Sequence, residues 1–212
     1  MTLPDGVERH DFDGETGLAT QGEPVYGERT DGSWRRWDPD RSKLGAMLEL
    51  GVETGLSGGE TVLYLGAAAG TTVSHVADFA GPTYAVEFAP RPVRDLLDAA
   101  EPRGNLFPLL KNARDPSSYA HVVEPVDVLV QDVATRGQAL VANRNAQFLG
   151  PDGTLLLAIK ARSEDVTADP EDVFDDVLDT LAERYEIVET RSLAPYHEDH
   201  LAVVARPRDG TF

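Results

Sequence analysis

The stretch from residue 61 to residue 72, Thr-Val-Leu-Tyr-Leu-Gly-Ala-Ala-Ala-Gly-Thr-Thr, limits the possible folds more than any other part of the chain. Its first five residues form an apolar run with a β-branched start, which is typical of a strand buried on both faces. Gly66 ends this run, and Gly70 leads into Thr71 and Thr72, which are good helix-starting residues. The stretch therefore predicts a strand, a tight turn and a helix start, whose unpaired N–H groups attract an anionic ligand.

Two common phosphate-binding motifs do not fit this turn. A P-loop requires Lys followed by Ser or Thr directly after its second glycine, whereas Gly70 is followed by Thr71. A dinucleotide fingerprint requires a middle glycine where Ala68 stands, which disfavours NAD or FAD because the pyrophosphate must touch the chain. Glu87 ends the next apolar run and is placed to bind both ribose hydroxyls. S-adenosylmethionine, a nucleoside with a carboxylate and no pyrophosphate, fits this description, and an ordinary α/β domain with a tight turn is the alternative.

Strands and helices alternate after the glycine pair at residues 58–59, which predicts an α/β fold with a mostly parallel sheet covered on both faces. Two closing strands are near each other in sequence, which indicates an antiparallel edge and a total of seven strands. The predicted strands are 61–65, 83–87, 106–110, 126–132, 154–160, 185–192 and 200–206, and the predicted helices are 71–80, 91–101, 137–149 and 170–185.

The N-terminal part of the chain differs from the rest. Residues 1–36 contain short alternating segments broken by turn residues and no helical period, so we predict a small β domain there and a second domain over 37–212. A helix is expected near 41–52, with Asp38 or Asp40 as its N-cap. Two nearby tryptophans, at positions 34 and 37, are predicted to anchor the core, with stacking on nucleic acid as the alternative.

The charge balance of the chain is unusual, with 37 acidic residues against 19 basic ones and a net charge of -18. Such a surface repels nucleic acid, unless it is an adaptation to concentrated salt, in which surface charges are screened. Arginine supplies sixteen of the basic residues, and the three lysines are Lys43, Lys111 and Lys160. The chain contains no cysteine, which excludes disulfides and thiolate chemistry, and no signal-like apolar run, so we expect a soluble, cytoplasmic protein.

Three charged residues end predicted strands at the edge where α/β sheets bind ligands. Glu87, Asp132 and Lys160 each follow an apolar run, so their side chains are expected to meet beyond the carboxyl ends of the strands. One cleft that contains all three side chains explains them better than separate roles would, in which Asp132 caps the following helix and Lys160 points into solvent. The segment from His197 to His200 offers a possible metal site, although an exposed polar turn is the more common meaning of such a segment.

Several segments together resemble the fibrillarin family, in particular its archaeal RNA 2′-O-methyltransferases. The most specific is the run at 63–76, Leu-Tyr-Leu-Gly-Ala-Ala-Ala-Gly-Thr-Thr-Val-Ser-His-Val. The resemblance covers most of the chain from about residue 25 onward. It continues through the segments at 25–29, 41–44, 84–88, 112–114, 132–134, 159–161, 195–196 and 199–200.

The resemblance implies a Rossmann-like S-adenosylmethionine-dependent methyltransferase fold. It implies an enzyme that modifies ribose 2′-hydroxyls of rRNA and leaves open whether tRNA is a further substrate. It also implies work within a ribonucleoprotein that contains a C/D box guide RNA, a Nop-domain scaffold protein and a kink-turn-binding protein. The implied catalytic set is Lys43, Asp132, Lys160 and His200, with His200 as the fourth member. The implied cofactor-binding residues are Gly66, Ala67, Thr71, Thr72, Glu87, Phe88, Asn112, Ala113, Asp132, Val133, Ala134 and Thr135.

The sequence departs from the family pattern at a few positions. Asn112 stands where the family usually has Asp, so a charged hydrogen bond to the adenine amino group becomes a neutral one. Ala69 replaces a common Ser, and Thr135 replaces a common Gln. Two other functions are weighed against methyl transfer: a nucleotide-dependent oxidoreductase, which Ala68 disfavours, and a non-catalytic binding subunit, which the lysines Lys43 and Lys160 disfavour.

Overall fold

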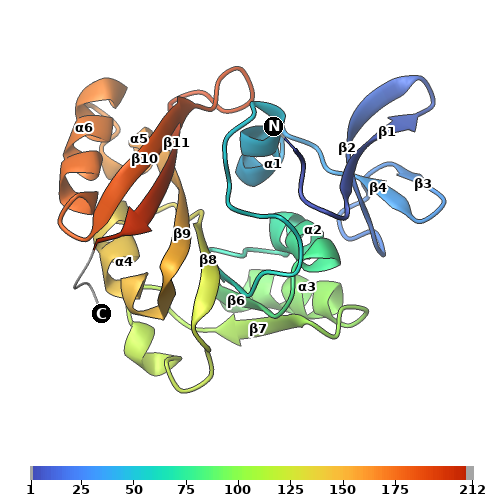
Figure 1. The fold of residues 1–212 in the computed structure, drawn as a ribbon, viewed down its shortest axis with the longest axis horizontal. Helices are drawn as coiled ribbons and strands as arrows, with labels where there is room; N and C mark the ends of the chain where they lie inside the picture. The colour runs from blue at the N-terminus through green and yellow to red at the C-terminus, as the bar shows by residue number, and fades with distance from the viewer. Residues whose placement is uncertain (1, 209–212) are drawn as a thin grey trace.

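The computed structural model describes residues 2–208 and contains two separate β-sheets (Figure 1). The smaller, N-terminal sheet is antiparallel, with the strand order β1-β2-β4-β3. It ends at Arg36, and the division of the chain into domains at that residue stays a prediction. Its strands are β1 (Val7–Phe12), β2 (Glu15–Gln21), β3 (Thr30–Asp31) and β4 (Trp34–Arg36).

The larger sheet has seven strands in the order β10-β11-β9-β8-β5-β6-β7. The five strands from β9 to β7 pair in parallel, whereas β11 and β10 complete one edge in antiparallel pairing, as the sequence predicts. The strands are β5 (Val62–Leu65), β6 (Thr83–Glu87), β7 (Leu106–Leu110), β8 (Val126–Gln131), β9 (Leu149–Lys160), β10 (Tyr185–Ser192) and β11 (His200–Pro207).

Helices cover both faces of this sheet and form two hydrophobic cores (Figure 1). Successive residues of β5 illustrate the division: Tyr64 belongs to one core, while Leu63 and Leu65 belong to the other. The first face carries α1 (Lys43–Glu49), α2 (Thr71–Phe79) and α3 (Pro90–Ala100), and the second carries α4 (Gln138–Asn145), α5 (Ala161–Glu164) and α6 (Pro170–Leu181). Short 3₁₀ turns occur at Pro116–Ser118 and Ala146–Phe148. None of the helices within residues 2–208 has the length and apolar character that crossing a membrane requires.

Several predicted boundaries are wrong. The helix predicted over 137–149 ends at Asn145, whose side-chain amide donates to the Val141 carbonyl oxygen (2.9 Å) and to the Ala113 carbonyl oxygen (2.8 Å). The helix predicted over 170–185 ends at Leu181. Strand β9 begins at Leu149 rather than at residue 154, because buried Leu149 pairs with Val126 before the register shifts.

The N-cap of α1 is Ser42, not Asp38 or Asp40 as predicted. Its hydroxyl oxygen accepts from the Gly45 N–H (3.0 Å) and from the indole N–H of Trp37 (2.8 Å). Because Trp37 is fully buried, this cap is fixed by the core and not only by local sequence. The prediction that both tryptophans anchor the core is confirmed for Trp37 and wrong for Trp34, which is only partly buried and stacks on His10 in the N-terminal sheet.

A buried charge network joins the N-terminal sheet to the larger domain. Arg35 of β4 is fully buried and donates to Asp78 of α2 (Nε to Oδ2, 2.8 Å) and to Glu28 (2.5 Å). Arg103, which follows α3, donates to the other oxygen of Asp78 at 2.9 Å, and the hydroxyl of Thr20 also donates to Asp78, at 2.7 Å. The Asp78 carboxylate therefore pairs with two guanidinium groups at the junction of three segments, and Glu28 supplies the second negative charge.

His75 of α2 fills the same junction as a neutral group. Its ring stacks on Trp37 with centroids 4.9 Å apart and planes 3° from parallel. Its two nitrogens lie 2.7 Å from the hydroxyl of Thr20 and 3.0 Å from that of Tyr26. Burial, together with the nearby positive charge of Arg35 and Arg103, holds the pKa of His75 well below its ordinary value. The junction thus packs an uncharged imidazole beside paired charges.

We expect Asp78→Asn to destabilise the protein by about 3–5 kcal/mol, because two guanidinium groups lose their shared counter-charge inside the protein. Urea unfolding followed by circular dichroism measures this change, and Asp175→Asn on the exposed face of α6 is the matched control. The control should stay within about 0.5 kcal/mol of the parent. Equal stability of the two variants would show that the network does not hold the junction together.

Candidate active site

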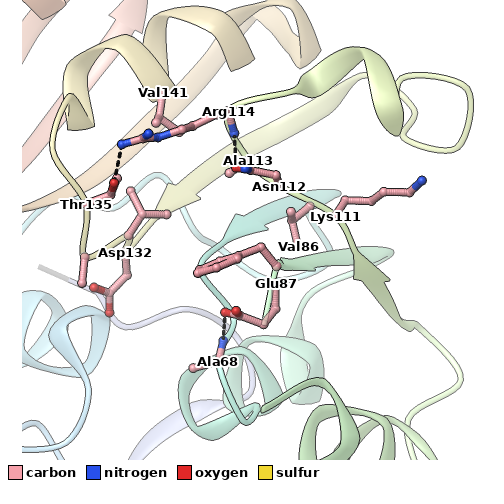
Figure 2. A pocket seen from close by; sticks show the side chains of 14 residues that line it. Ala68, Val86, Glu87, Lys111, Asn112, Ala113, Arg114, Asp132, Thr135 and Val141 are labelled. Atoms are coloured by element: carbon pink, nitrogen blue, oxygen red, sulfur yellow. Dashed lines mark hydrogen bonds between the residues drawn. The ribbon is translucent and has the colours of Figure 1, made fainter. Parts of the chain in front are cut away.

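A cavity of about 360 Å³ opens at the carboxyl ends of the parallel strands (Figure 2). It lies where β5 and β8 are neighbours although they are far apart in sequence, which is the switch point of the sheet. Its lining residues come from the end of β6, from the segments that follow strands β5, β6, β7 and β8, and from α4. They are Gly66, Ala68, Val86, Glu87, Phe88, Lys111, Asn112, Ala113, Arg114, Asp132, Val133, Ala134, Thr135 and Val141.

Two glycines shape the turn between β5 and α2, and the first of them, Gly66, lines the cavity. Gly66 has φ +86°, and a Cβ atom placed on it would lie 2.3 Å from the Asp132 carbonyl oxygen, so no other residue fits there. Gly70 is the N-cap of α2 with φ +91°, and no side chain among residues 2–208 caps this helix start. The N–H groups of the first turn of α2 are therefore available to an anionic group.

Glu87 is buried at the end of β6, and backbone N–H groups fix its carboxylate. One oxygen accepts from the Ala68 N–H at 3.0 Å, and the other accepts from the Ala89 N–H at 2.8 Å. Each oxygen keeps a further lone pair that can accept from a ligand hydroxyl. These lone pairs could accept from two vicinal hydroxyls, and the assignment of Glu87 to a ribose stays a prediction.

Arg114 links the two loops on the other side of the cavity. Its guanidinium donates to the Thr135 hydroxyl (2.5 Å) and to the Arg136 carbonyl oxygen (2.7 Å), and Figure 2 shows the side chain reaching toward Thr135. The Asn112 side-chain oxygen accepts from the Arg114 N–H at 3.0 Å and keeps one lone pair for a ligand. These contacts hold the loops after β7 and β8 at a fixed separation.

Lys43, from α1, reaches the end of β8 and pairs with Asp132. Its ammonium lies 3.0 Å from the Asp132 carboxylate, and both side chains are about a quarter exposed. Lys160 ends β9, beside β8 in the sheet. Among residues 2–208, no carboxylate lies within 4.0 Å of the Lys160 ammonium, so Asp132 orients Lys43 rather than Lys160.

His200 lies next to Lys160 across the β9–β11 pair. Its Nδ1 is 2.6 Å from the Glu198 carbonyl oxygen, and since a carbonyl only accepts, Nδ1 carries the proton. Its Nε2 is buried and has no hydrogen-bond partner within the described part of the chain. Burial, with the nearby charges of Lys43, His197 and Lys160, lowers the pKa of His200 below its ordinary value. His200 is thus a neutral imidazole with a free lone pair beside two ammonium groups.

The other predicted site residues are placed in two ways. Phe88 lines the cavity and is 71% exposed. Three of the predicted cofactor-binding residues do not line the cavity: Ala67 and Thr72 are buried, and Thr72 donates to the Ser42 hydroxyl at 3.1 Å, while Thr71 lies on a neighbouring hollow. The cleft predicted for Glu87, Asp132 and Lys160 contains the first two but not Lys160, because β9 lies beyond β8 from the cavity. Five residues that line the cavity were not predicted from the sequence: Ala68, Val86, Lys111, Arg114 and Val141. Arg114 could have been predicted, because it directly follows the predicted pair Asn112 and Ala113.

The segment from residue 197 to residue 200 does not favour the metal alternative. His197 Nε2 lies 2.9 Å from the Pro39 carbonyl oxygen, and Asp199 pairs with Arg162 at 2.8 Å. No group of three or more His, Asp or Glu side chains within residues 2–208 is arranged to hold a metal ion.

Comparisons with known proteins agree with this geometry. A fibrillarin-like rRNA/tRNA 2′-O-methyltransferase of Haloarcula marismortui is 79% identical over 98% of this chain and 99% of its own length. A protein of the same name from Methanosarcina mazei is 52% identical over 87% of this chain and 86% of its own length.

Solved structures with the same fold include a fibrillarin/Nop5p complex, with 40% identity, a TM-score of 0.90, and coverage of 98% of this chain and 100% of the other. Fibrillarin of Aeropyrum pernix with natively bound S-adenosyl-L-methionine is 42% identical with a TM-score of 0.82, over 97% of this chain and 100% of its own. The fibrillarin family model matches residues 7–209. This chain therefore belongs to the fibrillarin family.

Proposed function

We propose that this chain is an RNA 2′-O-ribose methyltransferase that uses S-adenosyl-L-methionine. The proposal rests on one observation: a cavity suited to a nucleoside and two lysines lie at the same edge of the sheet. This cavity, with Glu87 and Asp132 in its wall, meets the Lys43 ammonium at Asp132, and Lys160 ends β9, the strand next to β8. Relatives with 79% and 52% identity are named as rRNA/tRNA 2′-O-methyltransferases, which supports the same activity here.

The residues of the cavity fit S-adenosyl-L-methionine part by part. Glu87 would accept from the ribose hydroxyls, and Asn112 and Ala113 would meet the adenine edge. The uncapped start of α2 would receive the carboxylate, next to the bare backbone of Gly66. The bound cofactor supplies a methyl group on a positively charged sulfur. A related fibrillarin binds this cofactor natively, which supports the assignment.

Lys43 and Lys160 would stabilise the oxygen that attacks. An RNA 2′-hydroxyl becomes a better nucleophile as negative charge develops on its oxygen, and an ammonium group nearby favours that charge. Asp132 holds Lys43 at 3.0 Å and so fixes the place of one ammonium, while Lys160 has no carboxylate partner within residues 2–208 to offset its charge. Placing the hydroxyl beside these groups contributes further to the rate.

His200 would accept the hydroxyl proton. Its Nε2 carries a lone pair because Nδ1 donates to Glu198, and a buried acceptor without a partner costs about 1–3 kcal/mol. A donor arriving with the substrate, directly or through a water molecule, would remove that cost. The lowered pKa keeps the imidazole neutral at neutral pH, as a proton acceptor must be.

Partners of the enzyme are also part of the proposal. With a net charge of -18, the chain repels RNA, and concentrated salt weakens phosphate contacts further. A related fibrillarin has been crystallised with Nop5p, which supports a scaffold protein of the same type here. We propose that this scaffold, with a kink-turn-binding protein and a C/D box guide RNA, brings the target RNA to the site.

We expect Lys160→Ala to lower the single-turnover methylation rate by about 10²–10⁴-fold, because the developing alkoxide loses an ammonium group. Affinity for S-adenosyl-L-methionine, measured by calorimetry, should stay unchanged because Lys160 does not line the cofactor cavity. Arg191→Ala, which removes an exposed cation from β10, is the control. Methylation by Lys160→Ala at the parent rate would refute the assignment.

We expect the methylation rate to hold at neutral pH and to fall only in solution more acidic than the ordinary histidine pKa of 6.5. The pKa of His200 is lowered from 6.5, so its imidazole is neutral above that pH and protonates only in more acidic solution. A protonated imidazole cannot accept the hydroxyl proton. Single-turnover rates between pH 5 and 8 measure this acid limb, which His200→Ala should remove while lowering the plateau rate. An unchanged acid limb in that variant would assign the proton acceptor to another group.

We expect the isolated chain to bind cofactor but to methylate RNA poorly. Methylation mapping with and without the scaffold protein, the kink-turn-binding protein and a chosen guide RNA, in concentrated salt, measures the difference. Modification should appear at the guided nucleotide only in the complete mixture. Efficient, guide-independent methylation by the chain alone would contradict the proposed partners while leaving the activity intact.

A further inference from the structure

Gln138, the first residue of α4, has a fully buried side chain that pairs with the backbone of Lys160. The Lys160 N–H donates to the Gln138 Oε1 at 2.9 Å, and the Gln138 Nε2 donates to the Lys160 carbonyl oxygen at 3.1 Å. The amide therefore satisfies both backbone polar groups of one residue. A strand neighbour would normally make such a pair of contacts.

The pairing occurs where the sheet leaves Lys160 without a neighbouring strand on one side. The last residue pair between β8 and β9 is Gln131 with Leu157, so β8 ends before β9 reaches Lys160. On the other side, β11 is still present, and His200 pairs with Lys160. The side chain of Gln138 thus replaces the missing length of β8.

Gln138 is itself held from two directions. The carboxylate of Glu164 accepts from the Gly137 N–H (2.7 Å), from the Gln138 N–H (2.6 Å) and from the Gln138 Nε2 (3.1 Å). The buried side chain of Gln131, directly before Asp132, donates to the Gln138 carbonyl oxygen at 2.8 Å. Gln138 therefore connects the end of β8 with the end of β9.

These contacts fix the direction of the Lys160 side chain. The N–H of Lys160 belongs to the peptide group before its Cα, and the carbonyl belongs to the peptide group after it. Holding both groups fixes φ and ψ, which are -111° and 102°, and so fixes where the Cα–Cβ bond points. The long lysine side chain starts from this fixed direction.

We propose that Gln138 is a positioning residue for methyl transfer, which it serves by holding Lys160 so that the ammonium reaches the substrate oxygen. This inference rests on the proposed function, because it takes Lys160 as a catalytic residue. Only an amide of this length fits the position, since the Lys160 N–H requires an acceptor and the Lys160 carbonyl requires a donor. A glutamate would supply the acceptor alone and would face the carboxylate of Glu164.

Two variants test the proposal, Gln138→Met, which keeps the length and removes both polar contacts, and Gln138→Glu, which keeps the acceptor. We expect the single-turnover methylation rate to fall by about 10²-fold in Gln138→Met, because a displacement of about 1 Å has that effect. Cofactor affinity and the KM for the RNA should stay unchanged. Gln147→Met, at an exposed position in the turn after α4, is the matched control.

A second measurement reports on Lys160 without activity. Because the chain has three lysines, protein labelled with ¹³C-lysine gives three sets of side-chain NMR signals, which Lys→Arg variants assign. We expect the Lys160 signals to move in both Gln138 variants and those of exposed Lys111 to stay. Gln138→Glu keeps the measurement possible if Gln138→Met does not fold.

The outcomes separate the two proposals. Unmoved Lys160 signals, or movement of all three lysines with loss of cofactor binding, would overturn the positioning role. If the Lys160 signals move while both Gln138→Met and Lys160→Ala methylate at the parent rate, Gln138 places Lys160 as proposed, and the catalytic role of Lys160 is wrong.

Discussion

The site depends on one close approach, between Gly66 at the end of β5 and the backbone of Asp132 at the end of β8. Any Cβ on Gly66 would lie 2.3 Å from the Asp132 carbonyl oxygen, so the two strands can end side by side only with glycine there. The chain leaves β5 toward β6 and β7 and returns to β8 on the other side. The two connections diverge, which leaves the crevice between them open to a ligand.

The small N-terminal sheet bears on this crevice indirectly. Asp78 and His75 bind it to α2, which begins directly after the turn that carries the cavity residues Gly66 and Ala68. The segment that leaves the sheet carries buried Trp37, which donates to Ser42, the cap of α1. Lys43 is the first residue of α1, so the position of its ammonium beside Asp132 depends on contacts made far from the crevice. Displacing the sheet would displace a group at the reacting end of the site.

The sequence was most informative where local pattern and chemistry coincide. Two strands were predicted to end at Glu87 and Lys160, because an apolar run stops at each of these charged residues. Strands β6 and β9 do end there. The sequence pattern did not predict that Asp132 pairs with Lys43, because Lys43 is 89 residues away and reaches Asp132 only through the packing of α1. The pairing of Gln138 with Lys160 also escaped prediction, since a glutamine at a helix start has no sequence signal for the strand it completes.

Some of the many acidic residues form ion pairs with arginine. Several arginines form ion pairs, including buried Arg35 and Arg103, where a planar guanidinium can meet more than one oxygen.

The three lysines, by contrast, all lie at the carboxyl edge of the sheet: Lys43 pairs with Asp132, Lys111 lines the cavity rim, and Lys160 ends β9. A lysine ammonium is a compact point charge on a flexible stem, well suited to a single developing negative charge. In a chain where arginine supplies sixteen of the nineteen basic residues, lysine at positions 43 and 160 fits the proposed chemistry, which needs such a charge.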